Sequence, residues 1–302
     1  MYLITLQQIT KMFSYNLLGF ILRRCNVLSR EAGKVLSNLE LTLLLPCVSL
    51  SAFASNFTVE KLAENRLLVL FSVISFLLIF GGGTFIGRHL SQDHYTQNLC
   101  VFSINVTNIS YTGVPLVLAL YGEEMVMKLL VFAIPISIYG STIGNGLLLD
   151  LKGASAKNLL QPYFLSILAG IILGLTQIPI PGLIMEVLDG CSACMMPIAM
   201  LLTGCIMADF DLFHILDDWR VFAVSLIRMI AVPLLVLLIG SLIHLPKELM
   251  IILAAVYAMP VGANAVIVPT SAGKDCSLAT GVTFITNLIG LLTIPIFFML
   301  FA

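Results

Sequence analysis

The sequence predicts an all-α integral membrane protein with ten transmembrane helices, arranged as two five-helix repeats. The composition, the number of apolar segments and a weak internal similarity support this prediction. Of the 302 residues, 59% are hydrophobic and only 10% are charged, and the mean hydropathy is +1.06. Because about 25% of a soluble domain is charged, this chain cannot cover a water-facing surface. We expect it in the lipid bilayer of a cell (inner) membrane.

Ten apolar segments follow one another along the chain, each near the length of about 20 residues that a transmembrane helix needs. They lie at 3–23, 36–54, 65–88, 97–121, 125–149, 160–178, 185–208, 219–243, 248–270 and 278–301. A stretch with charges and glycine at 150–160 separates five segments from five. We therefore predict a first repeat over 1–150, a cytoplasmic linker over 151–159 and a second repeat over 160–302.

The two halves resemble each other at an offset of 151 residues. Pro46 then corresponds to Pro197, and Gly122 corresponds to Gly273. Since each repeat has an odd number of spans, the second repeat is expected to be inverted in the membrane, as in many secondary transporters.

The basic residues predict the orientation of these spans. Nine lie in or beside the loops of one side: Arg23, Arg24, Arg30, Lys34, Arg88, Lys152, Lys157, Arg220 and Lys274. Four lie on the other side: Lys61, Arg66, Lys128 and Lys247. The positive-inside rule assigns the richer side to the cytoplasm, so both termini are expected to be extracytoplasmic.

The fourth and ninth segments contain residues that interrupt helices. The fourth carries Gly113 and Pro115, and the ninth carries Pro260, Gly262 and Pro269. Proline removes a backbone hydrogen bond, and lipid cannot satisfy the freed groups, so a broken helix must be buried or line a wet cavity. Interrupted helices in corresponding parts of two repeats point to the substrate site of a transporter.

These breaks predict a site for an anion. Half-helices that start near Pro115 and Pro260 would present free N–H groups and the positive ends of their dipoles. Asn108 and Asn264 can donate to a carboxylate without adding a charge. Further candidate lining residues are Asn105, Ser110, Thr112, Gly113 and Gly262. The alternative is that the prolines only kink the helices and the asparagines bond to a neighbouring backbone.

Few charged residues lie inside the apolar segments. Arg228 lies about two turns into the eighth, where it either reaches the near interface or attracts an anion. Glu40, Asp189 and Asp209 fall near segment ends, so we expect no carboxylate deep in a span. This pattern favours an anionic substrate over coupling through an acidic relay.

Several motifs resemble the auxin efflux carrier family, which comprises small bacterial carriers and the plant PIN auxin exporters. The similarity extends along essentially the whole chain. Its motifs are Leu18-Gly19 with Arg23-Arg24, Pro46, Asn108 with Gly113-Val114-Pro115 and Gly122, Met259-Pro260 with Gly262 and Gly273-Lys274-Asp275, and Thr293-Ile294-Pro295.

The resemblance implies two inverted repeats whose broken helices four and nine cross at the midplane, usually in a homodimer. It also implies transport of a small organic anion such as auxin, malate or malonate. Helices one, two, six and seven would form a scaffold, and the other six would carry the substrate in an elevator-like movement. The carboxylate-binding asparagine of the family corresponds to Asn108.

Two residues depart from the plant members of the family. Those members have proline where this chain has Thr107, and a second helix-nine proline where it has Asn264. Their long central cytoplasmic loop is missing here. The differences predict a more polar pocket and argue against auxin as the substrate.

Two other functions stay open, a membrane ligand sensor that uses the same pocket and an ion-coupled carboxylate symporter. The sequence contains no phosphate loop, HExxH or GxSxG motif, so we expect no enzymatic activity, cofactor or metal site. The net charge of −1 gives no indication of a nucleic-acid partner.

Overall fold

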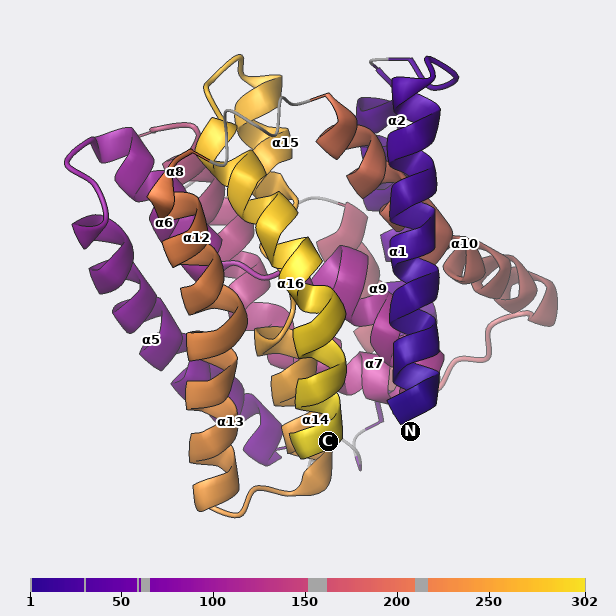
Figure 1. Cartoon of the computed structure of the whole chain (residues 1–302). Coiled ribbons are helices and arrows are strands. Elements are labelled where there is room, and N and C mark those ends of the chain that lie inside the picture. The colour runs from indigo at the N-terminus through magenta and orange to yellow at the C-terminus, as the bar shows by residue number, and fades with distance from the viewer. Residues whose placement is uncertain are drawn as a thin grey trace.

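The computed structural model describes residues 2–29, 31–58, 60, 66–151, 162–209 and 217–301, and their regular secondary structure is helical (Figure 1). The α-helices are α1 (Tyr2–Arg24), α2 (Ala32–Leu39), α3 (Leu45–Asn56), α5 (Arg66–His89), α6 (His94–Asn105), α7 (Val114–Tyr139), α8 (Asn145–Leu148), α9 (Pro162–Thr176), α10 (Gly182–Ala208), α12 (Trp219–Leu226), α13 (Val232–Leu242), α14 (Lys247–Tyr257), α15 (Asn264–Ser271) and α16 (Ser277–Phe301). Except for Leu151, the predicted linker at 151–159 lies outside the described residues.

Six helical segments of the described chain are long and apolar enough to cross a membrane. They are Ala32–Asn56, Leu67–His89, Val114–Leu148, Gly182–Ala208, Trp219–Leu242 and Ser277–Leu300. Large apolar side chains such as Leu77, Phe85 and Leu292 are exposed on them. Lipid tails are as apolar as leucine, so these surfaces suit a bilayer. The prediction of an all-helical, multi-pass membrane protein is confirmed.

The described residues form four single π-helical turns. Three of them, η1 (Glu40–Leu44), η3 (Gly140–Gly144) and η5 (Ile227–Ala231), lie inside these segments, and η2 (Ile109–Gly113) directly precedes the segment that starts at Val114. A π-turn inserts a residue into the α-helical repeat and is often found at functional sites. Three of the four, η1, η2 and η3, contribute residues to the cavity described below.

Glycines bring α1 and α10 into backbone contact. A Cβ atom at Gly19 would collide with the carbonyl of Leu201, and one at Gly204 would collide with the carbonyl of Asn16. Small residues at crossings of this kind let membrane helices approach closely. Figure 1 shows α1 beside α10.

The helices α3, α9 and α10 are packed in a similar way. A Cβ atom at Gly170 of α9 would lie 2.7 Å from the Cβ of Phe53 on α3. The Ser51 hydroxyl of α3 also lies 3.3 Å from a carboxylate oxygen of Asp189 on α10. Together, α1, α3, α9 and α10 form a closely packed group of helices.

Gly122 and Gly273 have matching backbone conformations. Their φ angles are +78° and +66°, and they are the positive-φ glycines of the described chain. Gly122 divides α7 into two helical parts, while Gly273 lies between α15 and α16. Glycine adopts positive φ without steric cost. The two positions are 151 residues apart, which is the offset found in the sequence.

The burial of Glu40 corrects one prediction. The helical segment begins at Ala32, four residues before the predicted start at 36, so Glu40 lies well inside the segment Ala32–Asn56. Its side chain is 0% exposed. The expectation that no carboxylate lies deep in a span is therefore wrong.

Candidate substrate site at the helix crossover

Two interrupted helices meet inside the protein. The helix α6 ends at Asn105, and Val106 has the extended conformation φ −104°, ψ 121°. The helix α14 ends at Tyr257, and α15 begins at Asn264. Between these ends, Thr107 and Val261 form an antiparallel bridge.

Hydrogen bonds between the two breaks satisfy their backbones. The N–H of Asn108 donates to the carbonyl of Pro260 at 2.8 Å, and the N–H of Gly262 donates to the carbonyl of Val106 at 3.1 Å. Each break therefore provides hydrogen-bond partners for backbone groups that have lost their helical partners in the other break. A membrane interior tolerates non-helical backbone only where such partners, or water in a cavity, are present.

The first break lies at Val106–Asn108 and not near Pro115, which corrects the prediction from the sequence. Pro115 is the second residue of α7, but the helical backbone does not begin there, since Gly113 before α7 is already helical. The η2 turn already starts at Ile109 and runs into α7. The second break contains Pro260, as the sequence predicts.

A cavity of about 100 Å³ adjoins this crossover. Its polar lining consists of Thr107, Asn108, Ser110, Ser137 and Asn264. The remaining lining residues are apolar or glycine: Leu41, Leu45, Val106, Ile109, Ile136, Gly140, Gly262 and Ala263. None of these described lining residues carries a charge.

The structure gathers four of the predicted residues, Asn108, Ser110, Gly262 and Asn264, in this cavity. It also adds two polar residues that the sequence analysis did not predict, Thr107 and Ser137. Thr107 is 6% exposed, and its hydroxyl oxygen has no hydrogen-bond partner among the described residues. Ser137 belongs to α7, and a hydroxyl within an apolar segment was the signal that could have identified it.

Other predicted residues lie elsewhere. Thr112 and Pro260 line a separate cavity of about 40 Å³, together with Asn16 of α1 and Asn287 of α16. The Asn105 amide donates to the hydroxyl of Thr84 at 3.1 Å. Two more lie outside both cavity linings, namely Gly113, packed against the carbonyl of Ala255, and Pro115.

Arg228 is fully buried behind the crossover. Its guanidinium donates to the carbonyls of Ile104 at 3.4 Å, Val256 at 3.3 Å, Tyr257 at 3.1 Å and Met259 at 3.1 Å. Carbonyls at helix C-termini lack helical partners and carry the negative end of the dipole. Arg228 therefore caps α6 and α14 together. It neither extends to the membrane interface nor lines the cavity.

The electrostatics of the cavity follow from these elements. Two helical segments begin beside it. One is η2 continued by α7, and the other is α15. Both direct N–H groups and positive dipole ends toward the crossover. Arg228 adds a fixed positive charge on the buried side, bonded to backbone carbonyls. These groups place positive charge and positive partial charges beside the cavity.

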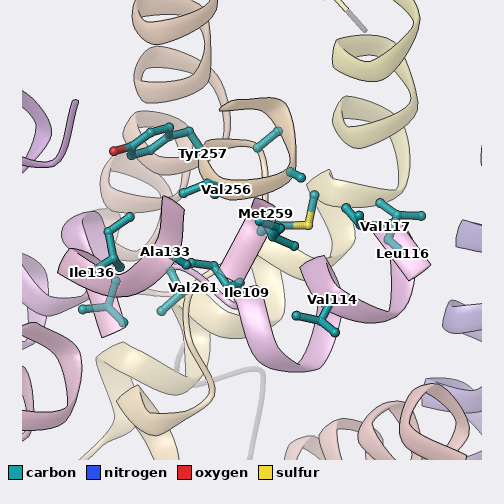
Figure 2. Packing of buried hydrophobic residues seen from close by; sticks show 14 of the residues in the cluster. Ile109, Val114, Leu116, Val117, Ala133, Ile136, Val256, Tyr257, Met259 and Val261 are labelled. Atoms are coloured by element: carbon teal, nitrogen blue, oxygen red, sulfur yellow. The ribbon is translucent and has the colours of Figure 1, made fainter. Parts of the chain in front are cut away.

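Apolar packing holds the crossing segments in place. Ile109, directly after the first break, and Val261, in the second, are buried in a single cluster with Ile136 and Tyr257. Figure 2 shows these side chains between the surrounding helices. A close-packed core resists displacement of its parts, so the polar groups of the cavity are held in a defined geometry.

A multi-pass helical protein with two interrupted helices crossing beside a polar cavity has the features of a membrane transporter. The chain belongs to the auxin efflux carrier family. The family model, described as membrane transport protein, matches residues 4–154 and 147–298, which together span nearly the whole chain. This confirms the resemblance seen in the sequence. A comparison with curated proteins gave no match.

Proposed function

We propose that this protein is a secondary transporter of a small organic anion, and that the anion's carboxylate binds in the crossover cavity. The observation that carries the proposal is the set of neutral donors, Asn108 and Asn264 among them, beside two helix N-termini. A carboxylate accepts hydrogen bonds from such groups, and charge-assisted bonds are about twice as strong as neutral ones.

The size of the cavity supports a small substrate. Its volume of about 100 Å³ is well below the roughly 300–1,000 Å³ of pockets for drug-sized ligands. Its polar lining suits a compact mono- or dicarboxylate better than an indole ring. Auxin is therefore not the substrate we propose.

The proposed topology has ten transmembrane helices in two inverted five-helix repeats, with both termini extracytoplasmic in the cell (inner) membrane. The similar backbone at Gly122 and Gly273 supports the repeat. Figure 1 shows both termini at the same end of the bundle, which agrees with an even number of spans. The proposed assembly is a homodimer, as the family resemblance implies.

The proposed mechanism is an elevator-like movement. The packed group of α1, α3, α9 and α10 would be the scaffold, and the helices that cross would move with the substrate. Small cavities between these two parts support this division. One of about 40 Å³ lies between Asn16 of α1 and Asn287 of α16, and one of about 10 Å³ lies between Thr203 of α10 and Thr280 of α16.

The test is counterflow in proteoliposomes. Vesicles loaded with one carboxylate are diluted into trace amounts of the radiolabelled acid, over a panel of mono- and dicarboxylates and their neutral amides. The proposal predicts that some acids accumulate and the amides do not. Asn108→Ala should lose this accumulation, and Asn38→Ala, an exposed site on α2, should keep it. Saturable binding without flux would instead indicate a ligand sensor.

A further inference from the structure

Glu40 is a buried carboxyl group that the proposed binding mode does not use. It is the first residue of the π-turn η1, in the helical segment Ala32–Asn56. Its side chain is 0% exposed. Neither carboxyl oxygen has a hydrogen-bond partner in the part of the chain that the structure describes.

No charged group among the described residues compensates this carboxyl. The elements that pack against η1 are α2, α3, α9 and α10. Their titratable residues are Lys34 on α2, Cys47 on α3, Tyr163 on α9, and Glu186, Asp189, Cys191, Cys194 and Cys205 on α10. The side chain of Tyr163 is outside the description, and Lys34 is exposed. Glu40 forms an ion pair with none of the described groups.

A buried group in this position is expected to be neutral. Removing a carboxylate from water without a counter-charge or donors is far more costly than removing a carboxylic acid. In this structure, Glu40 is therefore expected to carry its proton. It can ionise only when water or a cation reaches it.

The π-turn connects Glu40 to the substrate cavity. Leu41, the next residue, and Leu45, directly after the turn, both line that cavity. The same turn therefore supplies the buried acid and part of the cavity wall. A change in the wall, such as opening to water on one side of the membrane, changes the surroundings of the acid.

We infer that Glu40 is a proton-binding site that couples proton movement to anion transport. The coupling rests on the proposed function, whereas the proton site itself does not. When the cavity opens to one side, the carboxylic acid releases its proton to water there or the carboxylate takes one up. The buried position seen in the structure holds the neutral acid. One proton moving with a monoanion transfers no net charge.

The first test needs no substrate. Infrared difference spectra between neutral and alkaline pH, recorded on the purified protein, report the C=O stretch of a protonated carboxylic acid. A band present at neutral pH in the wild type and missing in Glu40→Gln supports the proton site. Glu31→Gln, at an exposed position near the start of the same segment, should keep the band. An identical band in wild type and Glu40→Gln would overturn the site.

The second test separates coupling from transport. Proteoliposomes with a trapped pH dye receive the transported acid from outside, and counterflow is measured in parallel. The wild type should acidify the interior with uptake. Glu40→Gln, which imitates the protonated acid, should keep counterflow but lose at least nine-tenths of the acidification. Wild-type counterflow without proton movement, or unchanged acidification in Glu40→Gln, would overturn the coupling and leave the proposed function intact.

Discussion

The backbone N–H of Asn108 donates a 2.8 Å hydrogen bond to the carbonyl of Pro260, and this bond ties together two segments about half the chain apart. Because this bond fixes the backbone N–H of Asn108, the position of Asn108 depends on the segment that contains Pro260. The amide side chain of Asn108 borders the cavity with Asn264. A substrate bound there, as we propose, would contact both segments at once, so its binding would be sensitive to their relative position.

A negative charge at Asn264 should exclude an anion from the cavity. Asn264→Asp keeps the size of the side chain but replaces donors by an acceptor and introduces a like charge. We expect at least a tenfold loss of carboxylate counterflow at neutral pH, and partial recovery at lower pH as the aspartate is protonated. Asn38→Asp, on the exposed face of α2, is the matched control. Unchanged counterflow in Asn264→Asp would remove this residue from the site.

Removal of Arg228 should destabilise the crossover. Arg228→Met leaves the carbonyls of Ile104, Val256, Tyr257 and Met259 without this donor. Since bonds to charged groups contribute about 1.5–3 kcal/mol each, we expect a loss of about 3 kcal/mol or more. Arg228→Lys should restore part of it, because it keeps the charge but not the planar fork. The unfolding temperature in detergent measures the effect, and Lys11→Met, at an exposed residue of α1, should leave it unchanged.

The contact between α1 and α10 should be intolerant of a methyl group. Gly204→Ala would force the helices apart, because the added atom meets the carbonyl of Asn16. Overpacking of this kind costs about 1–3 kcal/mol. The control is Gly190→Ala on the same helix, where an added Cβ meets nothing within 4 Å. Thermal unfolding should show a lower midpoint for Gly204→Ala alone. Equal midpoints for both variants would contradict the packing described for this pair.

The cap of α6 predicts a pH dependence. Asp93 accepts hydrogen bonds from the N–H and the hydroxyl of Thr96, both at 2.7 Å, and these bonds hold the pKa of Asp93 below its ordinary value. The stability they contribute is present above the unfolded pKa of about 3.9 and is lost as the pH falls through the folded pKa. Asp93→Asn also caps a helix but does not titrate, so its stability should fall less on acidification. Unfolding midpoints between pH 7 and pH 3 test this, and parallel curves would contradict it.

Much of the fold could be predicted from local sequence features. Apolar segments bounded by polar residues place helices such as α10 and α16 within a few residues of their observed bounds. The corresponding glycines, Gly122 and Gly273, could be found by comparing the two halves of the sequence, and both adopt positive φ, which glycine does without steric cost. These features can be identified in the sequence without knowledge of the tertiary contacts.

The parts that could not be predicted depend on tertiary contacts. The first break lies at Val106–Asn108 because its backbone pairs with Pro260 and Gly262, a partner that the local sequence does not reveal. Arg228 has its bonding role because the ends of α6 and α14 meet beside it. The burial of Glu40 follows from the packing of η1 against α2, α3, α9 and α10, which no pattern within the segment encodes.

The central claim is that the crossover cavity binds the carboxylate of the substrate. The most direct measurement is isothermal titration of the purified protein with the acid identified by counterflow, for wild type, Asn108→Ala, Asn264→Ala and the control Asn38→Ala. A hydrogen bond to a charged group contributes about 1.5–3 kcal/mol, so Kd should rise roughly ten- to hundredfold in each cavity variant and stay unchanged in the control. Wild-type affinity in both cavity variants would contradict the claim.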